Sequence, residues 1–168
     1  FLYAYQTFLW NEMRIADYGG TENIGKNVVK DMLAESGLKN YHMLDFDNGI
    51  DLRKPIKGKK FDLGICMDLF EHVSNPFVVA KNIVDSMNPG AFLYVTSPFV
   101  WELHGYPKDY WRFTPDGLME LFKKLETMIV YTEVDSHEDK KKSKQVIPVS
   151  RPWTRVIGVF RKPLKKKQ

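Results

Sequence analysis

Two histidines, His72 and His104, are the side chains best suited to move a proton at neutral pH. If a group of a bound substrate must lose a proton during a reaction, either histidine could act as the base. His72 lies near the end of residues 61–73, where a run of apolar residues gives way to acids, among them Glu71. His72 could instead fix its loop by hydrogen bonds. We expect Glu71 to bond the backbone at the start of a short helix, with a catalytic role as the alternative.

His104 lies in a long loop, residues 98–113, that is rich in aromatic side chains. Functional residues concentrate in such loops. The aromatic rings of residues 98–113 could line a pocket for a substrate. Alternatively, the loop could close as a lid or pack its own rings into the protein interior. Asp109 and Arg112 are placed to form an ion pair that fixes the loop, although Arg112 could instead hold an acidic group of the acceptor. The candidate acceptor-binding residues are Trp101, Tyr106, Asp109, Tyr110, Trp111 and Arg112.

A strand, a glycine turn and a helix are predicted near the start of the chain. Residues 13–18 predict the strand, and Gly19 and Gly20 form the turn. Apolar residues then recur at helical spacing until Gly37. Such a junction presents backbone N–H groups and the positive end of a helix to a ligand, so it is a candidate binding site.

Acidic residues lie at the carboxyl ends of two further predicted strands, residues 41–46 and residues 61–67. Residues 41–46 predict a short strand with Asp45 and Asp47 at its tip, and residues 50–52 predict a rudimentary further strand. Residues 61–67 are almost continuously apolar, which is typical of a strand covered on both faces of a parallel sheet. Open sheets of this kind bind ligands at the carboxyl ends of their strands, where these acids would lie.

The alternation of strand and helix continues through the middle of the chain. Asn75 is a helix cap and Pro76 a first helical residue, and the predicted helix reaches the turn at residues 88–90. Residues 91–97 predict another buried strand. We therefore predict an α/β fold: a doubly wound, mostly parallel Rossmann-like sheet with helices on both faces.

The last third of the chain predicts a helix that begins at residues 114–116, followed by two strands at residues 128–134 and 155–161. No helix is predicted between these two strands, so they are expected to form an antiparallel pair. The sheet would then have an antiparallel edge strand on an otherwise parallel body.

The composition fits one domain covering residues 1–168, because 43% hydrophobic residues suffice for a sizeable core. We expect an aromatic helix at residues 1–11, which could pack across the sheet or mediate a homodimer. A mobile charged loop is expected at 135–147 and a basic tail at 162–168. The net charge of +4 comes largely from lysines in these last two segments, which are either solvated or in contact with a polyanion.

Cys66 is the only cysteine, which excludes an intrachain disulfide and a cysteine-based zinc site. This favours a reducing, cytoplasmic setting. No apolar run is long enough to span a membrane. The sequence lacks a Gly-x-x-x-x-Gly-Lys phosphate loop and a His-Glu-x-x-His pair, and we predict no metal from it.

Three segments resemble the class I S-adenosylmethionine-dependent methyltransferases of the small-molecule type, and the resemblance covers nearly all of the chain. They are residues 61–73, the turn at residues 88–90, and residues 104–114, which read His-Gly-Tyr-Pro-Lys-Asp-Tyr-Trp-Arg-Phe-Thr. The first two are shared by many small-molecule members. The third resembles a substrate-side loop of bacterial-type methyltransferases, some of them linked to glycan or natural-product tailoring.

The resemblance implies a set of residues that bind S-adenosylmethionine. Asp17, Gly19 and Gly20 would form the turn beside its methionine part, and Asp45 would hold the ribose diol, with Asp47 as a competitor for that role. Asp51 and Leu52 would flank the adenine, and Met67 and Asp68 would contact the cofactor after residues 61–67. The family pattern Asp-x-Gly-x-Gly-x-Gly is incomplete, because Thr21, Glu22 and Asn23 follow Gly20. Glu22 would repel the cofactor carboxylate.

The function implied is in-line transfer of a methyl group from S-adenosylmethionine to a small-molecule or sugar-containing acceptor. One alternative is a methyltransferase-like domain that has lost turnover and serves as a binding or scaffold module. A second is a nucleic-acid methyltransferase that uses the lysine clusters, and a third, a nicotinamide oxidoreductase, would require a fuller glycine fingerprint. No Asn-Pro-Pro-aromatic sequence is present, which disfavours methylation of the amino group of adenine or of a protein glutamine.

Overall fold

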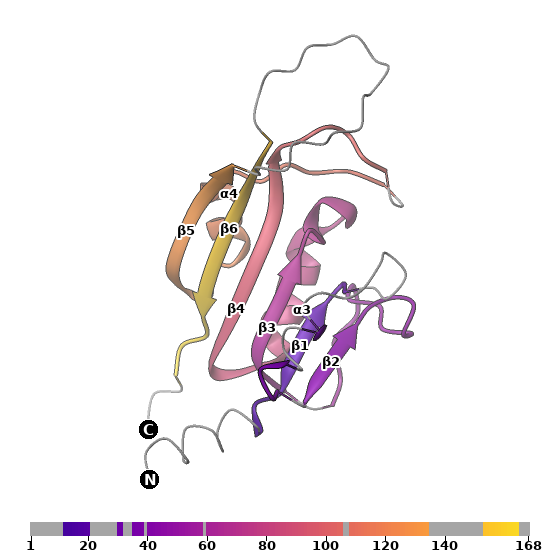
Figure 1. Ribbon diagram of the computed structural model, residues 1–168, viewed down its shortest axis with the longest axis vertical. Coiled ribbons are helices and arrows are strands. Elements are labelled where there is room, and N and C mark those ends of the chain that lie inside the picture. Colours follow the sequence, from indigo (N-terminus) through magenta and orange to yellow (C-terminus); the bar gives the residue numbers. More distant parts are fainter. Residues whose placement is uncertain are drawn as a thin grey trace.

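The computed structural model describes residues 12–20, 30–31, 35–38, 40–58, 60–105, 108–134 and 153–164. Within these ranges, six strands form one sheet in the order β2-β1-β3-β4-β6-β5 (Figure 1). The predicted helix at 1–11 and the predicted loop at 135–147 lie outside the described residues. In the part of the chain that is described, no helix is both long and apolar enough to cross a membrane.

Four strands of the sheet run parallel: β1 (Ile15–Tyr18), β2 (Tyr41–Leu44), β3 (Phe61–Met67) and β4 (Met87–Val100). Tyr18 lies opposite Leu44 on β2, and Met67 lies opposite Thr96 on β4. The carboxyl ends of β1, β2 and β3 therefore meet at one edge of the sheet, as the sequence predicts. The predicted strands at 13–18, 41–46 and 61–67 are confirmed, with ends shifted by a residue or two.

Residues 50–52 do not form the rudimentary strand predicted for them. The chain turns back directly after β2, because Ile50 N donates to Asp45 O at 2.8 Å and Gly49 adopts a φ of 77°. A second turn follows, in which Lys54 N donates to Asp51 O at 2.9 Å. These local bonds use the backbone groups that a sheet ladder would need.

β5 (Glu126–Val134) and β6 (Thr154–Arg161) form the predicted antiparallel pair. The prediction of an antiparallel edge strand is wrong in detail, because β6 pairs antiparallel with both β4 and β5 and so lies inside the sheet. β5 forms the edge and runs in the same direction as β4. Burial explains this order: Val156 and Phe160 of β6 are fully buried, whereas Met128 and Ile129 of β5 are half exposed. The strand with the stronger apolar pattern takes the interior position.

Two helices lie behind the sheet in the view of Figure 1 and contact each other: α3 (Pro76–Ser86) and α4 (Pro115–Leu121). Each begins as predicted, with proline in the first turn and a side-chain cap. Asn75 Oδ1 accepts from Val78 N at 3.3 Å, and Thr114 Oγ1 accepts from Gly117 N at 3.1 Å. The predicted helix after Gly20 falls largely in residues 21–29 and 32–34, outside the described part, so helices on both faces remain a prediction.

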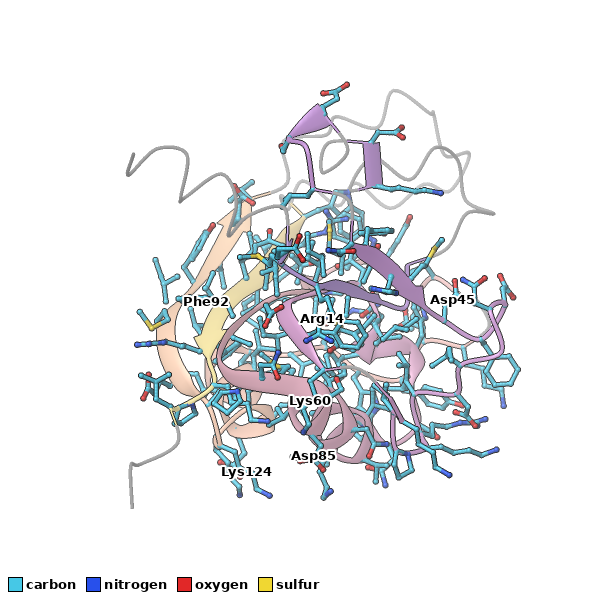
Figure 2. All side chains as sticks on the ribbon, turned by 90° about the horizontal axis from the view of Figure 1, so that it is seen from below. Arg14, Asp45, Lys60, Asp85, Phe92 and Lys124 are labelled. Atoms are coloured by element: carbon cyan, nitrogen blue, oxygen red, sulfur yellow. The ribbon has the colours of Figure 1, made fainter. Side chains whose placement is uncertain are left out.

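Backbone carbonyls at the end of α3 accept hydrogen bonds from two lysines that flank strands of the sheet. Lys60, just before β3, donates from Nζ to Asp85 O at 2.8 Å (Figure 2). Lys162, just after β6, donates from Nζ to Val84 O at 2.7 Å and to Met87 O at 2.9 Å. Lysines suit this place because the last carbonyls of a helix carry partial negative charge.

The main hydrophobic core lies between α3, α4 and the sheet. Val79 and Ile83 of α3 and Leu118 of α4 are fully buried in one cluster with Leu93 and Phe160 of the sheet. This core fixes β3 and β4, and with them the loop that follows β4.

Candidate functional site

The turn after β1 requires glycine at both of its described positions. Gly19 has a φ of 81°, and a Cβ there would lie 2.8 Å from Leu69 Cδ1. A Cβ at Gly20 would overlap the Asp17 carboxylate. Asp17 is itself buried and accepts a hydrogen bond from the Tyr41 hydroxyl, which links β1 to β2. The backbone of the turn can therefore lie close to a ligand only because side chains are missing.

The two acids proposed for a ribose diol differ in their surroundings. Asp45 is buried at the end of β2, and its Oδ1 accepts from Asn48 N at 2.7 Å. Asp45 also directly follows Leu44, whose carbonyl accepts from Gly19 N at 2.9 Å. Asp47 is exposed. The structure thus brings Asp45 next to the glycine turn and leaves Asp47 further out on the loop.

The residues proposed to flank the adenine lie on the turn after β2. Asp51 pairs with Arg53, with Nε–Oδ1 at 2.8 Å and Nη2–Oδ2 at 3.1 Å. The hydrogen bond from Arg53 lowers the pKa of Asp51 below its ordinary value. Leu52 is buried, and its carbonyl accepts from Asn82 Nδ2 at 2.9 Å. These contacts attach the turn to α3.

Asp68 follows β3 directly and is the only non-glycine residue of the described ranges with a positive φ, at 48°. Its Oδ1 accepts from Thr96 Oγ1 at 3.0 Å, and its Oδ2 lies 3.2 Å from Arg155 Nη2. The neighbouring Met67 is partly exposed. Sequence reasoning missed Thr96 and Arg155, because they come from β4 and β6 and their proximity depends on the strand order.

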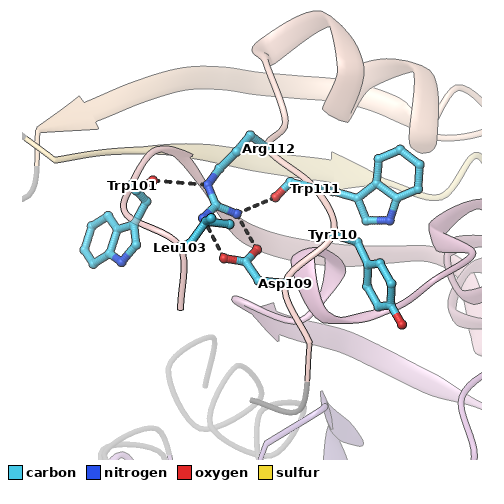
Figure 3. Close-up of a pocket in the computed structure, with 6 residues that line it drawn as sticks. All are labelled: Trp101, Leu103, Asp109, Tyr110, Trp111 and Arg112. Carbon is cyan, nitrogen blue, oxygen red and sulfur yellow. Dashed lines mark hydrogen bonds and ion pairs between the residues drawn. The ribbon is translucent and has the colours of Figure 1, made fainter. Parts of the chain in front are cut away.

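The loop after β4 is held by Arg112 (Figure 3). Its guanidinium forms a two-pronged ion pair with Asp109, with Nη1–Oδ1 at 2.5 Å and Nη2–Oδ2 at 2.7 Å. It also donates to the carbonyls of Glu102 at 2.8 Å and Trp111 at 2.7 Å, and more weakly to that of Trp101 at 3.5 Å. Hydrogen bonds from Arg112 hold the pKa of Asp109 far below its usual range. Arg112 therefore joins the two ends of the loop.

An open cavity of about 270 Å³ lies in this loop. The structure brings together there the described members of the predicted acceptor-binding set, and Tyr106 lies outside the described residues. Tyr110 and Trp111 are partly exposed, and the Trp101 ring is covered by the Arg155 guanidinium at 4.9 Å. The cavity is lined by Trp101, Leu103, Asp109, Tyr110, Trp111 and Arg112.

His72 and His104, which sequence reasoning treated separately, lie against each other with ring centroids 5.0 Å apart. Glu71, in the short 3-10 helix η1 (Phe70–His72), lies beside both rings. The Glu71 side chain is fully buried, and its Oε1 is 3.8 Å from His72 Nε2 and 3.9 Å from His104 Nε2. Burial raises the pKa of Glu71 to about 7. The loop also closes over this residue, because Tyr110 N donates to Glu71 O at 2.7 Å.

Glu71 is the member of this cluster that sequence reasoning undervalued. The sequence indicates a possible role for Glu71 only through its position beside His72, directly after a predicted buried strand. The signal was incomplete because His104 joins the pair only when the loop folds back onto η1. Groups with strongly shifted pKa values in such places are candidates for function.

Comparison with known proteins finds no matching family model and no matching curated protein. Solved structures do match. The S-adenosylmethionine dependent methyltransferase from Mesorhizobium loti is 14% identical, with a TM-score of 0.63 over 91% of this chain and 92% of that one. A SAM-dependent methyltransferase structure from Methanosarcina mazei is 15% identical, with a TM-score of 0.59 over 96% and 98%. The [4+2]-cyclase SpnF is 16% identical, with a TM-score of 0.62 over 97% and 80%.

These likenesses show the fold. The chain has the fold of the class I S-adenosylmethionine-dependent methyltransferases, which confirms the resemblance seen in the sequence. The cyclase shares that fold while carrying a name for different chemistry, so the fold alone does not fix the reaction.

Proposed function

We propose that the protein transfers a methyl group from S-adenosylmethionine to a small-molecule or sugar-containing acceptor. The observation that carries this proposal is the meeting of the glycine turn, Asp45 and Asp68 at one edge of a methyltransferase-fold sheet. That edge, outside the carboxyl ends of the strands, is where open α/β sheets bind their ligands. The aromatic cavity of the following loop supplies a place for the acceptor.

The described residues fit the cofactor. Gly19 and Gly20 cannot carry a Cβ without a clash, which is the local structure expected where backbone must approach a ligand. Asp45 offers a carboxylate whose direction is fixed by Asn48, and carboxylates at this place bind ribose hydroxyls. Asp68, held by Thr96 and Arg155, would border the cofactor after β3.

Bound S-adenosylmethionine would supply an already activated methyl group, so the protein's main task is to position the acceptor. Arg112 joins the two ends of the aromatic loop and so holds the residues that line the acceptor cavity in place. His104, which is partly exposed beside that cavity, would accept the proton that an acceptor hydroxyl or amine releases. His72 would keep the ring of His104 in place through their edge contact.

Isothermal titration with S-adenosylmethionine and S-adenosylhomocysteine tests the proposal. The wild-type protein should bind both, and Asp45→Ala should weaken binding by about 10-fold or more, because a hydrogen bond to a charged group contributes about 1.5–3 kcal/mol. Asp47→Ala is the matched control and should change the affinity by less than about twofold. The reverse result would assign the ribose to Asp47. Absence of binding at millimolar ligand would refute the proposal.

A binding module without turnover is the second candidate, and the residues after Gly20 favour it. Thr21, Glu22 and Asn23 replace the usual glycines, and Glu22 adds a negative charge where the cofactor carboxylate would lie. This candidate predicts that Glu22→Gly strengthens S-adenosylmethionine binding. If the wild-type protein already binds the cofactor tightly and Glu22→Gly changes nothing, the argument for an impaired turn fails.

A further inference from the structure

We propose that Glu71, His72 and His104 bind a divalent transition-metal ion, of which Zn²⁺ is the natural probe. One potential ligand atom from each residue lies within 4.8 Å of the other two. Two atoms that each bind one ion at about 2.1 Å can be at most about 4.2 Å apart. The distances from Glu71 Oε1 to the two histidine Nε2 atoms, 3.8 and 3.9 Å, already meet this limit. Two of the three separations are therefore already short enough for one ion.

The second nitrogen of each ring shows that both Nε2 atoms are free to bind metal. His72 Nδ1 lies 2.8 Å from Lys108 O, and a carbonyl can only accept, so this nitrogen carries the proton. His104 Nδ1 lies 3.3 Å from both Asp109 Oδ2 and Glu102 O, which are also acceptors. A neutral imidazole has one N–H, so a neutral ring with this N–H on Nδ1 keeps on Nε2 the lone pair that a metal ion needs. Metal-binding histidines are oriented by acceptors in this way.

The Glu71 carboxylate, which lies beside both rings, lacks a partner that a cation would supply. Glu71 Oε1 is buried and has no hydrogen-bond partner among the described residues, while Oε2 accepts from Ser97 at 3.4 Å. A proton on Glu71 would not solve this, because 3.8 and 3.9 Å are too long for a hydrogen bond to either histidine. The surroundings therefore favour an added positive charge.

The donor set indicates the class of ion and its role. Two imidazole nitrogens and one carboxylate suit Zn²⁺, Fe²⁺ or Mn²⁺ better than Ca²⁺ or Mg²⁺, which prefer oxygen ligands alone. Three protein ligands leave open positions on the ion. Asp109 and Tyr110 touch the cluster and also line the cavity, so an acceptor there could reach it. The catalytic role of the ion rests on the proposed methyl transfer, whereas its binding does not. With the ion bound, His104 would be a ligand and no longer the proton acceptor, and the ion would ease loss of the acceptor's proton.

Zinc binding to the full chain, purified without a histidine tag and stripped with a chelator, tests the inference. Isothermal titration should show one Zn²⁺ per chain, and His104→Gln should weaken this binding by about 100-fold, since even the loss of an outer partner costs about 10–100-fold. His42→Gln is the matched control, because His42 packs against Phe61 on the sheet. It should leave the affinity within about threefold. Equal loss in both variants, or no loss in His104→Gln, would overturn the proposal.

A second measurement needs no variant. In nitrogen NMR of the histidine rings, Zn²⁺ should shift the Nε2 signals of His72 and His104 and leave those of His42 unchanged. Absence of any shift at millimolar Zn²⁺, Fe²⁺ and Mn²⁺ would also overturn the proposal. Both experiments are done without S-adenosylmethionine, so a failure here leaves the methyl-transfer proposal standing, and a failure of cofactor binding leaves this one standing.

Discussion

Replacing Arg112 with lysine is expected to open the loop at residues 98–113 without unfolding the sheet. The arginine reaches both oxygens of Asp109 and the carbonyls of Glu102 and Trp111 at once. A lysine ammonium is a single point and cannot span these acceptors, so the variant keeps the charge and loses the geometry. The core under α3 and α4 does not include Arg112 and should stay folded.

The size of the effect follows from the bonds lost. A hydrogen bond that involves a charged group contributes about 1.5–3 kcal/mol, and lysine should keep only part of the set. The Arg112 side chain is 25% exposed, so water replaces some of the loss. A net cost of about 2 kcal/mol for loop closure corresponds to about a 30-fold rise in the open population.

Hydrogen exchange at two backbone amides measures this directly. His104 N donates to Asp109 Oδ2 at 3.0 Å, and Tyr110 N donates to Glu71 O at 2.7 Å. Both amides should exchange about 30-fold faster in Arg112→Lys, while amides of β3 and β4 keep their protection. Arg53→Lys is the control: its pair with Asp51 has a similar two-pronged form, but the Arg53 side chain is 58% exposed. Unchanged protection of both loop amides in Arg112→Lys would refute the reasoning.

Three further predictions concern the fold that supports the site. Ser86→Ala removes the hydrogen-bond partner of the buried Tyr18 hydroxyl, which lies 2.7 Å from Ser86 Oγ. The free energy of unfolding, measured with urea, should fall by about 1–3 kcal/mol. An unchanged urea midpoint would contradict this. Gly64→Ala would place a methyl group 2.7 Å from Leu93 Cδ1 and should lower the free energy of unfolding by about 1–3 kcal/mol. In the control Gly105→Ala, the added Cβ meets no described atom within 4 Å, so the loss should be less than about 0.5 kcal/mol. Burial raises the pKa of Tyr18, so above about pH 10 the unfolded chain loses a proton that the native state keeps. Stability should then fall with rising pH by up to about 1.4 kcal/mol per pH unit, and Tyr18→Phe should reduce that slope; identical slopes would exclude Tyr18 as the cause.

Local sequence patterns predicted most of the described elements because each pattern has a local physical cause. The run of apolar residues in β3 and the Asn75-Pro76 start of α3 act within a few residues, and both were found in place. The beginning of β4 at Met87 was not foreseen. Pairing of Met87 with Phe61 carries the strand through a turn-like sequence, with Gly90 at a φ of 82°. That pairing is a contact between distant segments, which a local pattern does not contain.

The order of the last two strands shows the same limit on a larger scale. Sequence patterns gave the antiparallel pairing of β5 and β6, since no helix is predicted between them. They did not give the insertion of β6 beside β4, which depends on which strand buries more apolar surface. Arg155 reaches Asp68 only because of that insertion. A residue of the site was therefore missed for a reason that lies in the topology.

The cluster of Glu71, His72 and His104 depends on such long-range contacts more than any other part of the site. The sequence supplies the three residue types, but their separation is set by the loop, which returns to η1 through the bond from Tyr110 N to Glu71 O. Asp109 then performs two tasks, since one carboxylate accepts from Arg112 and also faces His104 Nδ1. An ion-binding arrangement and a loop-closing ion pair thus share one side chain. For this reason the two histidines could be proposed as separate bases from sequence, while their joint use as ligands of one ion could be inferred only from the folded loop.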